Sequence, residues 1–194
     1  PHGVLVARDG TEYAIEDSAA PIHDSRGAVI GYVVVFHDVS HARRLARQLS
    51  WQASHDVLTG LGNRLEFEAV MAQMWESAKF HSKQHALVYM DLDQFKIVND
   101  TCGHAAGDEL LRQLAVIISA KVREGDSLFR LGGDEFAILL NGCPISRAEG
   151  IANEIRLVVE EFRFMWEGKP FSIGASIGLV PITVDSVSVA SLLA

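Results

Sequence analysis

The chain has 194 residues, 48% of them hydrophobic, with a formal net charge of −8 and a pI of about 5.4. Its hydrophobic content suffices for a buried core, and its acidity disfavours DNA or RNA as a partner, because nucleic-acid-binding proteins present positive charge. Two cysteines suggest no disulfide framework, and no hydrophobic run could cross a bilayer, so we expect a cytoplasmic segment without membrane contact. The chain begins without methionine, so we expect a longer parent protein, which could be membrane-anchored.

The first 39 residues are predicted to form a separate β unit. Glycine-containing turns divide its hydrophobic runs, as in antiparallel hairpins. The predicted strands lie at 3–6, 12–16 and 29–36. Three strands make a thin core by themselves. The unit is therefore either the remainder of a larger sheet or an arbitrary small meander.

Residues 40–55 are predicted to form a helical linker. Ala42, Leu45, Leu49 and Gln52 recur at steps of three and four residues, which gives a short heptad-like seam. One interpretation is an ordinary amphipathic connector. The other is a parallel coiled coil that joins two copies of the chain.

A short hydrophobic strand at 86–90 ends in the acidic sequence Asp91-Leu92-Asp93. Because side chains alternate along a strand, Asp91 and Asp93 should point to one face and Leu92 to the other. The carboxylates at this strand end are therefore candidates for a site rather than for the core.

A second acidic strand end lies at Gly132, Gly133, Asp134 and Glu135, between two hydrophobic runs. The pattern predicts a β-hairpin with its tip at the glycines, where positive φ angles are tolerated. Adjacent carboxylates repel one another, so a bound cation is expected. Acids from two strands suit Mg²⁺, which keeps several waters and shares its other positions with substrate phosphates.

The remaining pattern alternates helices and strands. Capping boxes are predicted at Asn63 with Glu66 and at Ser146 with Glu149, each opening a helix. Another helix is predicted from 108 to about 121 and a final strand from 171 to 180. This order favours an α/β (α+β) domain with a mostly antiparallel central sheet flanked by helices.

Four motifs in the same order resemble those of the GGDEF domain of the diguanylate cyclase family. They lie at 56–64, 91–100, 103–108 and 132–136. The resemblance covers residues 56–194 and implies a nucleotidyl-cyclase palm-like fold that condenses two GTP molecules into cyclic di-GMP and two pyrophosphates. The family's domain ends in a helix that supplies Lys and Arg to the triphosphate, and we expect the chain to lack most of it.

The resemblance assigns the metal and the chemistry to the two acidic strand ends. Asp91, the main-chain carbonyl of Leu92, Asp134 and Glu135 would hold Mg²⁺, with Mn²⁺ as a substitute. Asp134 and Glu135 would be the catalytic acids, and Asp134 is the first choice for deprotonating the ribose 3′-hydroxyl.

The resemblance also implies the GTP-binding residues. Asn99 and a buried Asp108 would read the guanine edge, with His104 close by, and a carboxylate left unpaired there would penalise ATP. The glycines Gly132 and Gly133 would lie against the nucleotide. The backbone amides that would cradle the β- and γ-phosphates are those of Asp93, Gln94, Phe95 and Lys96.

A further resemblance concerns regulation. Arg123 and Asp126 match the RxxD product-inhibition site of the family, in the correct register before the hairpin. Arg123 would contact product phosphate or guanine, and Asp126 would accept from guanine. Glu154 stands where some relatives carry a second arginine, so inhibition is either weaker or supported by Arg156.

Residues 1–39 resemble the last three strands of a PAS sensor domain, although no PAS ligand can be assigned to them. The expected protein is thus a PAS-regulated, Mg²⁺-dependent diguanylate cyclase with RxxD inhibition, which acts as a homodimer through the linker helix and PAS part. Its partners would be GTP and cyclic di-GMP, without nucleic acid. The alternative is a GTP-binding regulatory module that controls a C-terminal EAL phosphodiesterase.

Overall fold

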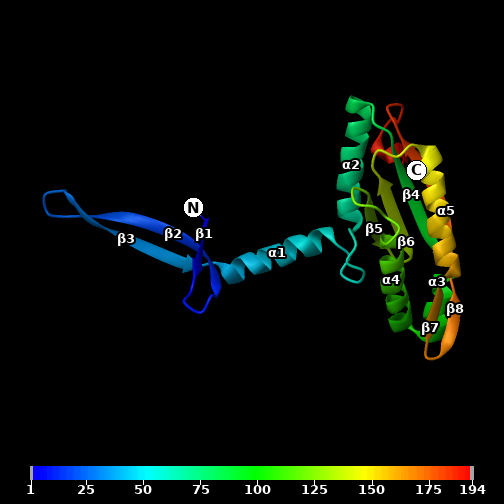
Figure 1. Ribbon diagram of the computed structural model, residues 1–194, viewed down its shortest axis with the longest axis horizontal. Helices are drawn as coiled ribbons and strands as arrows, with labels where there is room; N and C mark the ends of the chain where they lie inside the picture. Colours follow the sequence, from blue (N-terminus) through cyan, green and yellow to red (C-terminus); the bar gives the residue numbers. More distant parts are fainter. Residues whose placement is uncertain (1, 193–194) are drawn as a thin grey trace. The chain divides into compact units, whose positions relative to one another are not determined.

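The computed structural model describes residues 2–192 and divides the chain into two compact units, Pro1–Trp51 and Gln52–Ala194. The smaller unit is a three-stranded antiparallel sheet in the order β1-β2-β3, followed by a helix (Figure 1). Its elements are β1 His2–Val6, β2 Glu12–His23, β3 Val29–Asp38 and α1 Ser40–Ser54. No helix among the described residues is both long and apolar enough to span a membrane.

The strand β2 is longer than predicted and includes Pro21. Only Glu12–Glu16 of β2 pairs with β1, so beyond this segment one side of β2 has no strand partner. A proline without an N–H group is tolerated at such an edge. The predicted strand at 12–16 therefore covers only the part of β2 that pairs with β1.

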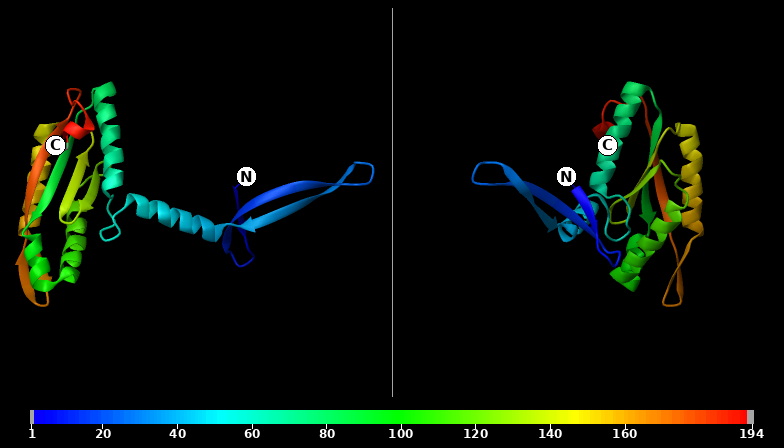
Figure 2. Two further views of the ribbon diagram at one scale, coloured as in Figure 1. Left: turned by 180° about the vertical axis from the view of Figure 1, so that it is seen from behind. Right: turned by 60° about the vertical axis from the view of Figure 1, so that its left-hand side comes forward.

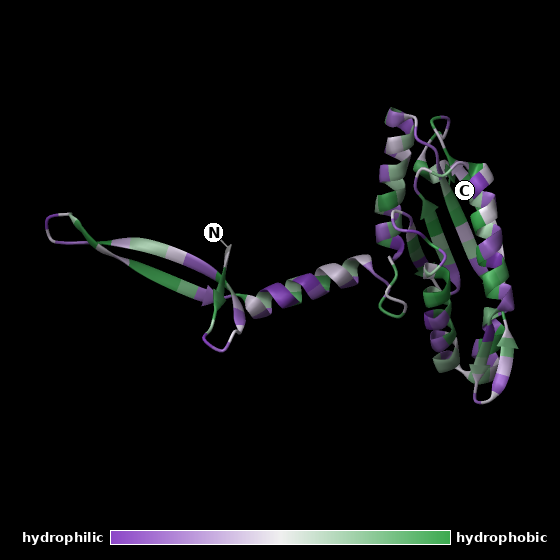
Figure 3. Cartoon of the chain, in the orientation of Figure 1, coloured by the Kyte–Doolittle hydropathy of each residue, from purple (hydrophilic) through white to green (hydrophobic). Residues whose placement is uncertain are grey.

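The smaller unit exposes its apolar side chains. Among residues 3–51, none is buried, and Val33, Val34 and Phe36 on β3 are 47%, 47% and 55% exposed. Figure 3 shows the hydrophobic character of these strands. Hydrophobic sequence alone therefore does not produce a core in this unit.

The larger unit is built on a four-stranded antiparallel sheet in the order β5-β6-β4-β9. The strand β4 lies inside the sheet and pairs with both β6 and β9. The elements are α2 Arg64–His81, β4 His85–Asp93, α3 Phe95–Cys102, α4 His104–Ser119, β5 Ser127–Gly132, β6 Glu135–Leu140, α5 Ile145–Glu161, β7 Arg163–Trp166, β8 Lys169–Ser172, β9 Gly174–Ile182 and α6 Val189–Leu192. The predicted fold class is confirmed.

Helices cover both faces of this sheet (Figures 1 and 2). On one face Leu87 of β4 joins a core with Phe67 and Met71 of α2. On the other, Val88 and Met90 join a core with residues of α4 and α5. Burial on both faces explains why β4 is a continuous hydrophobic run until its acidic end.

Helix starts agree with the sequence in one case and differ in another. The Asn63 side chain accepts from the Glu66 amide at 3.1 Å, which confirms the predicted cap of α2. The capping box at Ser146 is wrong, because α5 begins at Ile145 and has no side-chain cap. The amides of Arg147 and Ala148 donate to the Pro144 carbonyl instead, so the first turn closes earlier.

Two predicted boundaries also shift. The helix α4 begins at His104 rather than at residue 108, directly after Gly103, whose φ is 82°. It ends at Ser119. The strand predicted from 171 to 180 is two strands, since β8 pairs with β7 in a hairpin whereas β9 pairs with β4. The division depends on which strand each segment pairs with. The periodicity of a single segment gives no information about its pairing partner.

Candidate functional site

The two acidic strand ends lie side by side in the sheet. Asp91 of β4 is paired in register with Glu135 of β6, and the Leu92 amide donates to the Asp134 carbonyl at 3.3 Å. Asp91 is exposed, Asp134 and Glu135 are half-buried, and the Leu92 side chain is buried on the opposite face. The sheet thus brings together the acids that the sequence assigned to one site.

The hairpin tip depends on its glycines. Gly132 ends β5 with φ of 145°, and Gly133 has φ of 53°, a left-handed conformation that other residues adopt with strain. The β5–β6 register shifts between Arg130 and Gly132, so the tip is irregular. This backbone presents Asp134 at the turn, beside the end of β4.

The electrostatic environment of Asp91 is unfavourable for a free carboxylate. Desolvation first, and then the charges of Asp134, Glu135 and Asp93, raise the pKa of the Asp91 carboxyl. A cation bound among these oxygens would reverse the effect, because it would favour the ionised form.

The donor set suits Mg²⁺ better than a metal that needs a full protein cage. Among residues 2–192, no group of three or more His, Cys, Asp or Glu side chains is arranged to hold a metal by itself. Mg²⁺ commonly takes only one or two carboxylates, with waters and substrate phosphates as its other ligands. The carboxylates of Asp91 and Glu135, paired in register, fit that description, and Asp134 at the turn lies beside them as a further acid.

Arg64, at the start of α2, contacts the hairpin from outside. Its Nη2 lies 3.2 Å from Oε2 of Glu135, and its Nε donates to the Leu131 carbonyl at 3.3 Å. Glu135 also accepts from Tyr89, and desolvation followed by this hydrogen bond raises the pKa of the Tyr89 hydroxyl. Sequence reasoning gave Arg64 no role, although it is the last residue of the motif at 56–64.

Arg130 ties the hairpin tip to the loop before α2. Its Nε and Nη2 both donate to the Gly133 carbonyl, at 3.0 and 2.9 Å, and its Nη1 contacts both carboxylate oxygens of Asp56. Burial opposes ionisation of Asp56, but hydrogen bonds from Thr59 and Arg130 outweigh it and hold the Asp56 pKa below its ordinary value. In the sequence, the only sign of a role for Asp56 was its place at the start of the motif at 56–64.

The predicted phosphate loop lies at the N-terminus of α3. Gln94 has φ of 64° and occupies the cap position, where no side-chain hydrogen bond satisfies the first helical amides. Phe95 is buried and anchors the helix, whereas Lys96 is exposed. The Asp93 carboxylate accepts from the Ser176 hydroxyl at 2.7 Å, which turns it toward β9. Free amides at a helix start favour bound phosphate.

The Asn99 side chain of α3 lies against Gly107 of α4, the residue before Asp108 in the chain. A Cβ atom at Gly107 would fall on the Asn99 side-chain oxygen, so glycine leaves room for that amide. His104 and Asp108 are exposed. The expectation that Asp108 is buried is therefore wrong in the single chain. Asp108 lies in the first turns of α4, on the side that faces away from the core.

The RxxD residues form a closed pair. Arg123 Nε donates to Asp126 Oδ2 at 2.9 Å, its Nη2 donates to the Asn141 carbonyl, and the Asn141 amide donates to Asp126 Oδ1. Both residues line a cleft of about 360 Å³ that also includes Gly62 of the loop before α2. Arg156 instead contacts Glu160 and Asn153 within α5.

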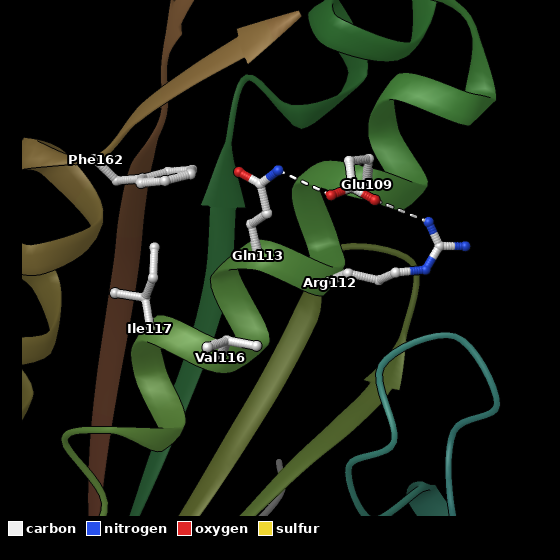
Figure 4. Close-up of a pocket in the computed structure, with 6 residues that line it drawn as sticks. All are labelled: Glu109, Arg112, Gln113, Val116, Ile117 and Phe162. Atoms are coloured by element: carbon white, nitrogen blue, oxygen red, sulfur yellow. Dashed lines mark hydrogen bonds and ion pairs between the residues drawn. The ribbon is translucent and has the colours of Figure 1, made fainter.

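A shallow apolar pocket on α4 lies apart from these residues. It is lined by Val116, Ile117 and Phe162, and at its rim Glu109 bonds both Gln113 and Arg112 (Figure 4). No residue that the sequence assigned to a site lines it. The pair of Arg112 and Glu109 is therefore a useful reference for an ion pair outside the site.

Comparisons with known proteins place the chain in a family. Residues 53–194 match the family model for "Diguanylate cyclase, GGDEF domain". The chain is 45% identical over 179 residues to a probable diguanylate cyclase, DgcE, of Escherichia coli K12, which covers 92% of this chain. It is also 36% identical over 126 residues, 65% of this chain, to the cyclic di-GMP phosphodiesterase PdeB of Shewanella oneidensis. It spans only 16% of the length of DgcE and 14% of PdeB.

Among solved structures, the coiled coil and GGDEF domain of DgcB from Caulobacter crescentus, in complex with c-di-GMP, is similar with a TM-score of 0.74. The two chains are 26% identical, and the match covers 80% of this chain and 82% of that one. The sequence match, the fold and the acidic hairpin agree, and the chain belongs to the GGDEF family of diguanylate cyclase domains.

Proposed function

We propose that this chain is the catalytic segment of a diguanylate cyclase, which joins two GTP molecules into cyclic di-GMP. The observation that carries the proposal is the register of Asp91 with Glu135, which places the acids of two strand ends beside the glycine turn. Desolvation and the nearby acids, which raise the pKa of Asp91, support it, because a carboxylate in this environment favours a bound cation. The proposed substrate is a cytoplasmic nucleotide, so the reaction is assigned to the cytoplasm.

In the proposed mechanism, residues of this chain bind and orient one GTP. The backbone amides from Asp93 to Lys96, at the end of β4 and the start of α3, hold the β- and γ-phosphates. Asn99 and Asp108 pair with the guanine edge, and His104 lies at the entrance. Mg²⁺ or Mn²⁺, held by Asp91, the Leu92 carbonyl, Asp134 and Glu135, supplies charge neutralisation for the phosphates when bound.

Asp134 then accepts the proton of the ribose 3′-hydroxyl. The freed oxygen attacks the α-phosphorus of the second GTP, a new phosphodiester bond forms, and the bond to pyrophosphate breaks. The same exchange in the opposite direction closes the ring and releases the second pyrophosphate. Positioning and electrostatic stabilisation provide most of the catalysis in such phosphoryl transfers.

The reaction requires two domains, since one domain presents one nucleotide. We assign dimer formation to the linker helix α1 and the unit before it. Leu45 and Leu49 on α1 are 46% and 66% exposed, and the helix has no buried residue, so its apolar seam is open to a partner. The smaller unit is proposed to be the C-terminal part of a PAS domain that regulates the cyclase.

Product inhibition is proposed to act at Arg123 and Asp126. These residues line the cleft of about 360 Å³, and their donors and acceptors suit guanine and phosphate. Arg156 contacts Glu160 within α5, so we do not include it in the proposed product site.

The test is to incubate the full-length protein with GTP and Mg²⁺ and to measure cyclic di-GMP by chromatography. We expect product from the wild type and a loss of at least ~10²-fold in Asp134→Ala, the range for removing a general base. Asp185→Ala, an exposed acid after β9, is the matched control and should retain activity. Absence of product in the wild type, or full activity in Asp134→Ala, would contradict the assignment.

A second candidate is a GTP-binding regulatory module that controls a phosphodiesterase domain. The similarity to PdeB, named as a cyclic di-GMP phosphodiesterase, favours it. The intact acids of the hairpin favour the cyclase instead. Phosphodiesterase activity of the full-length protein that rises with GTP, without synthesis of cyclic di-GMP, would select the second candidate.

A further inference from the structure

Arg64 bridges the two strands at the base of the hairpin. Its Nε contacts the carbonyl of Leu131, which precedes the tip, and its Nη2 contacts Oε2 of Glu135, which follows the tip. The two contacts use different nitrogens of one planar guanidinium, so the first fixes where the second lies. One carboxylate oxygen of Glu135 is thereby engaged on the side of α2.

The backbone from which the Arg64 side chain extends is itself fixed. It is the first residue of α2, directly after the capping residue Asn63. One turn further, the buried Phe67 packs edge-on against Phe129 of β5, with ring centroids 5.5 Å apart. The helix start is therefore locked to the strand that leads to the hairpin, and a side chain on such a base can hold a carboxylate in a defined orientation.

We propose that Arg64 is a positioning residue for Glu135, which orients its carboxylate toward Asp91 and the metal that the proposed function requires. This inference rests on the proposed function. Carboxylates that bind metals are usually hydrogen-bonded themselves, and loss of such a partner commonly weakens metal binding about 10- to 100-fold. Arg64 supplies such a hydrogen bond to Glu135 from α2, while Glu135 is paired in register with Asp91 of β4.

The charge of Arg64 by itself predicts a change in metal affinity opposite to the change that a positioning role predicts. A guanidinium beside a cation site repels the cation, so its removal should tighten metal binding by Coulomb's law. If Arg64 orients Glu135, its removal should loosen metal binding. The sign of the change therefore separates the two effects.

The experiment titrates Mn²⁺ into the full-length protein with a saturating non-hydrolysable GTP analogue and follows free Mn²⁺ by electron paramagnetic resonance. We expect Arg64→Gln to weaken Mn²⁺ binding ~10-fold. Arg64→Lys keeps the charge but cannot make both contacts, and we expect its affinity to lie nearer to Arg64→Gln than to wild type. Thermal unfolding of each variant corrects for the folded fraction.

Two controls isolate the contact with Glu135. Arg112→Gln removes an ion pair of the same 3.2 Å length on α4, outside the site, and should leave Mn²⁺ affinity unchanged (Figure 4). In a Glu135→Gln background, Arg64→Gln should cause no further loss, because its effect passes through Glu135. A full additional loss in that background would overturn the proposal.

The outcomes distinguish the inference from the function beneath it. If the wild type binds no Mn²⁺ with the GTP analogue, the proposed metal site fails. If the wild type binds Mn²⁺ and Arg64→Gln binds it equally or more tightly, only the positioning role is overturned. Wild-type affinity in Arg64→Lys would also overturn it, since the double contact of the guanidinium would then not be required.

Discussion

The strand β5 follows one cluster of charged residues and ends at another, and the two clusters are balanced differently. Before β5, Arg123 and Asp126 pair with one another, and the Asp126 side chain is only 2% exposed. After β5, Asp134 and Glu135 lie near Asp91, whose pKa is raised by desolvation and then by the surrounding acids. The first cluster satisfies its own charges, whereas the second contains more acids than cations.

This difference has consequences for ligand binding. A satisfied pair keeps its geometry without a ligand, so a product that binds there must exchange existing hydrogen bonds for new ones. Crowded acids store repulsion that a cation relieves, and strain of this kind commonly marks functional sites. The proposed regulatory site is therefore a preformed cluster, and the proposed metal site is a cluster of crowded acids.

The largest expected effect that tests this comparison concerns Arg123. Arg123→Ala removes donors to both Asp126 and the Asn141 carbonyl, and we expect cyclic di-GMP to bind ~10- to 100-fold more weakly by calorimetry, the loss typical of charged hydrogen bonds. Arg156→Ala should bind the product as the wild type does, because that side chain is engaged with Glu160. Equal binding in both variants would remove Arg123 from the product site.

A smaller effect is expected at the ion pair that supports the tip. Asp56→Asn breaks a pair whose side chains are 12% and 23% exposed, and we expect a loss of ~2 kcal/mol of unfolding free energy at pH 7, less than for a fully buried pair. The pKa of Asp56 is lowered in the folded state, so its stabilisation is present above the ordinary value of 3.8 and is lost as pH falls through the lower folded value.

Chemical denaturation of wild type and Asp56→Asn across pH 3–7 checks this prediction. The difference between the two proteins should narrow below about pH 3.8. A difference that stays constant over that range would show that the charge of Asp56 contributes nothing.

The smallest expected effect is a gain in stability at the strained cluster. The pKa of Asp91 is raised in the folded state, so its ionised form opposes folding above the folded pKa, and this penalty disappears as pH falls below 3.8. We expect Asp91→Asn to raise the Tm of the metal-free protein at pH 7 by ~1–2 °C while abolishing cyclase activity. A lower Tm at pH 7 in metal-free calorimetry would contradict the account of crowded acids.

Local patterns were sufficient for the acidic strand ends, because two glycines and alternating apolar residues determine a hairpin and its faces. The Asn63 cap was predictable for the same reason. The contacts of Arg64 with Glu135 and of Arg130 with Asp56 were not, because they join residues 71 and 74 positions apart. The exposure of Asp108 was missed because the family role suggested a buried site, while α4 places that residue on its outer side.

The close packing at Gly107 limits which residues can replace this glycine during evolution. Any side chain there would displace the Asn99 amide and would press on the buried Phe95 ring, whose Cζ lies 3.2 Å from where the new Cβ atom would stand. A descendant that replaced this glycine would therefore have to move the side chain that the proposed function assigns to the guanine edge. Under that proposal, the replacement would weaken the preference for GTP over ATP.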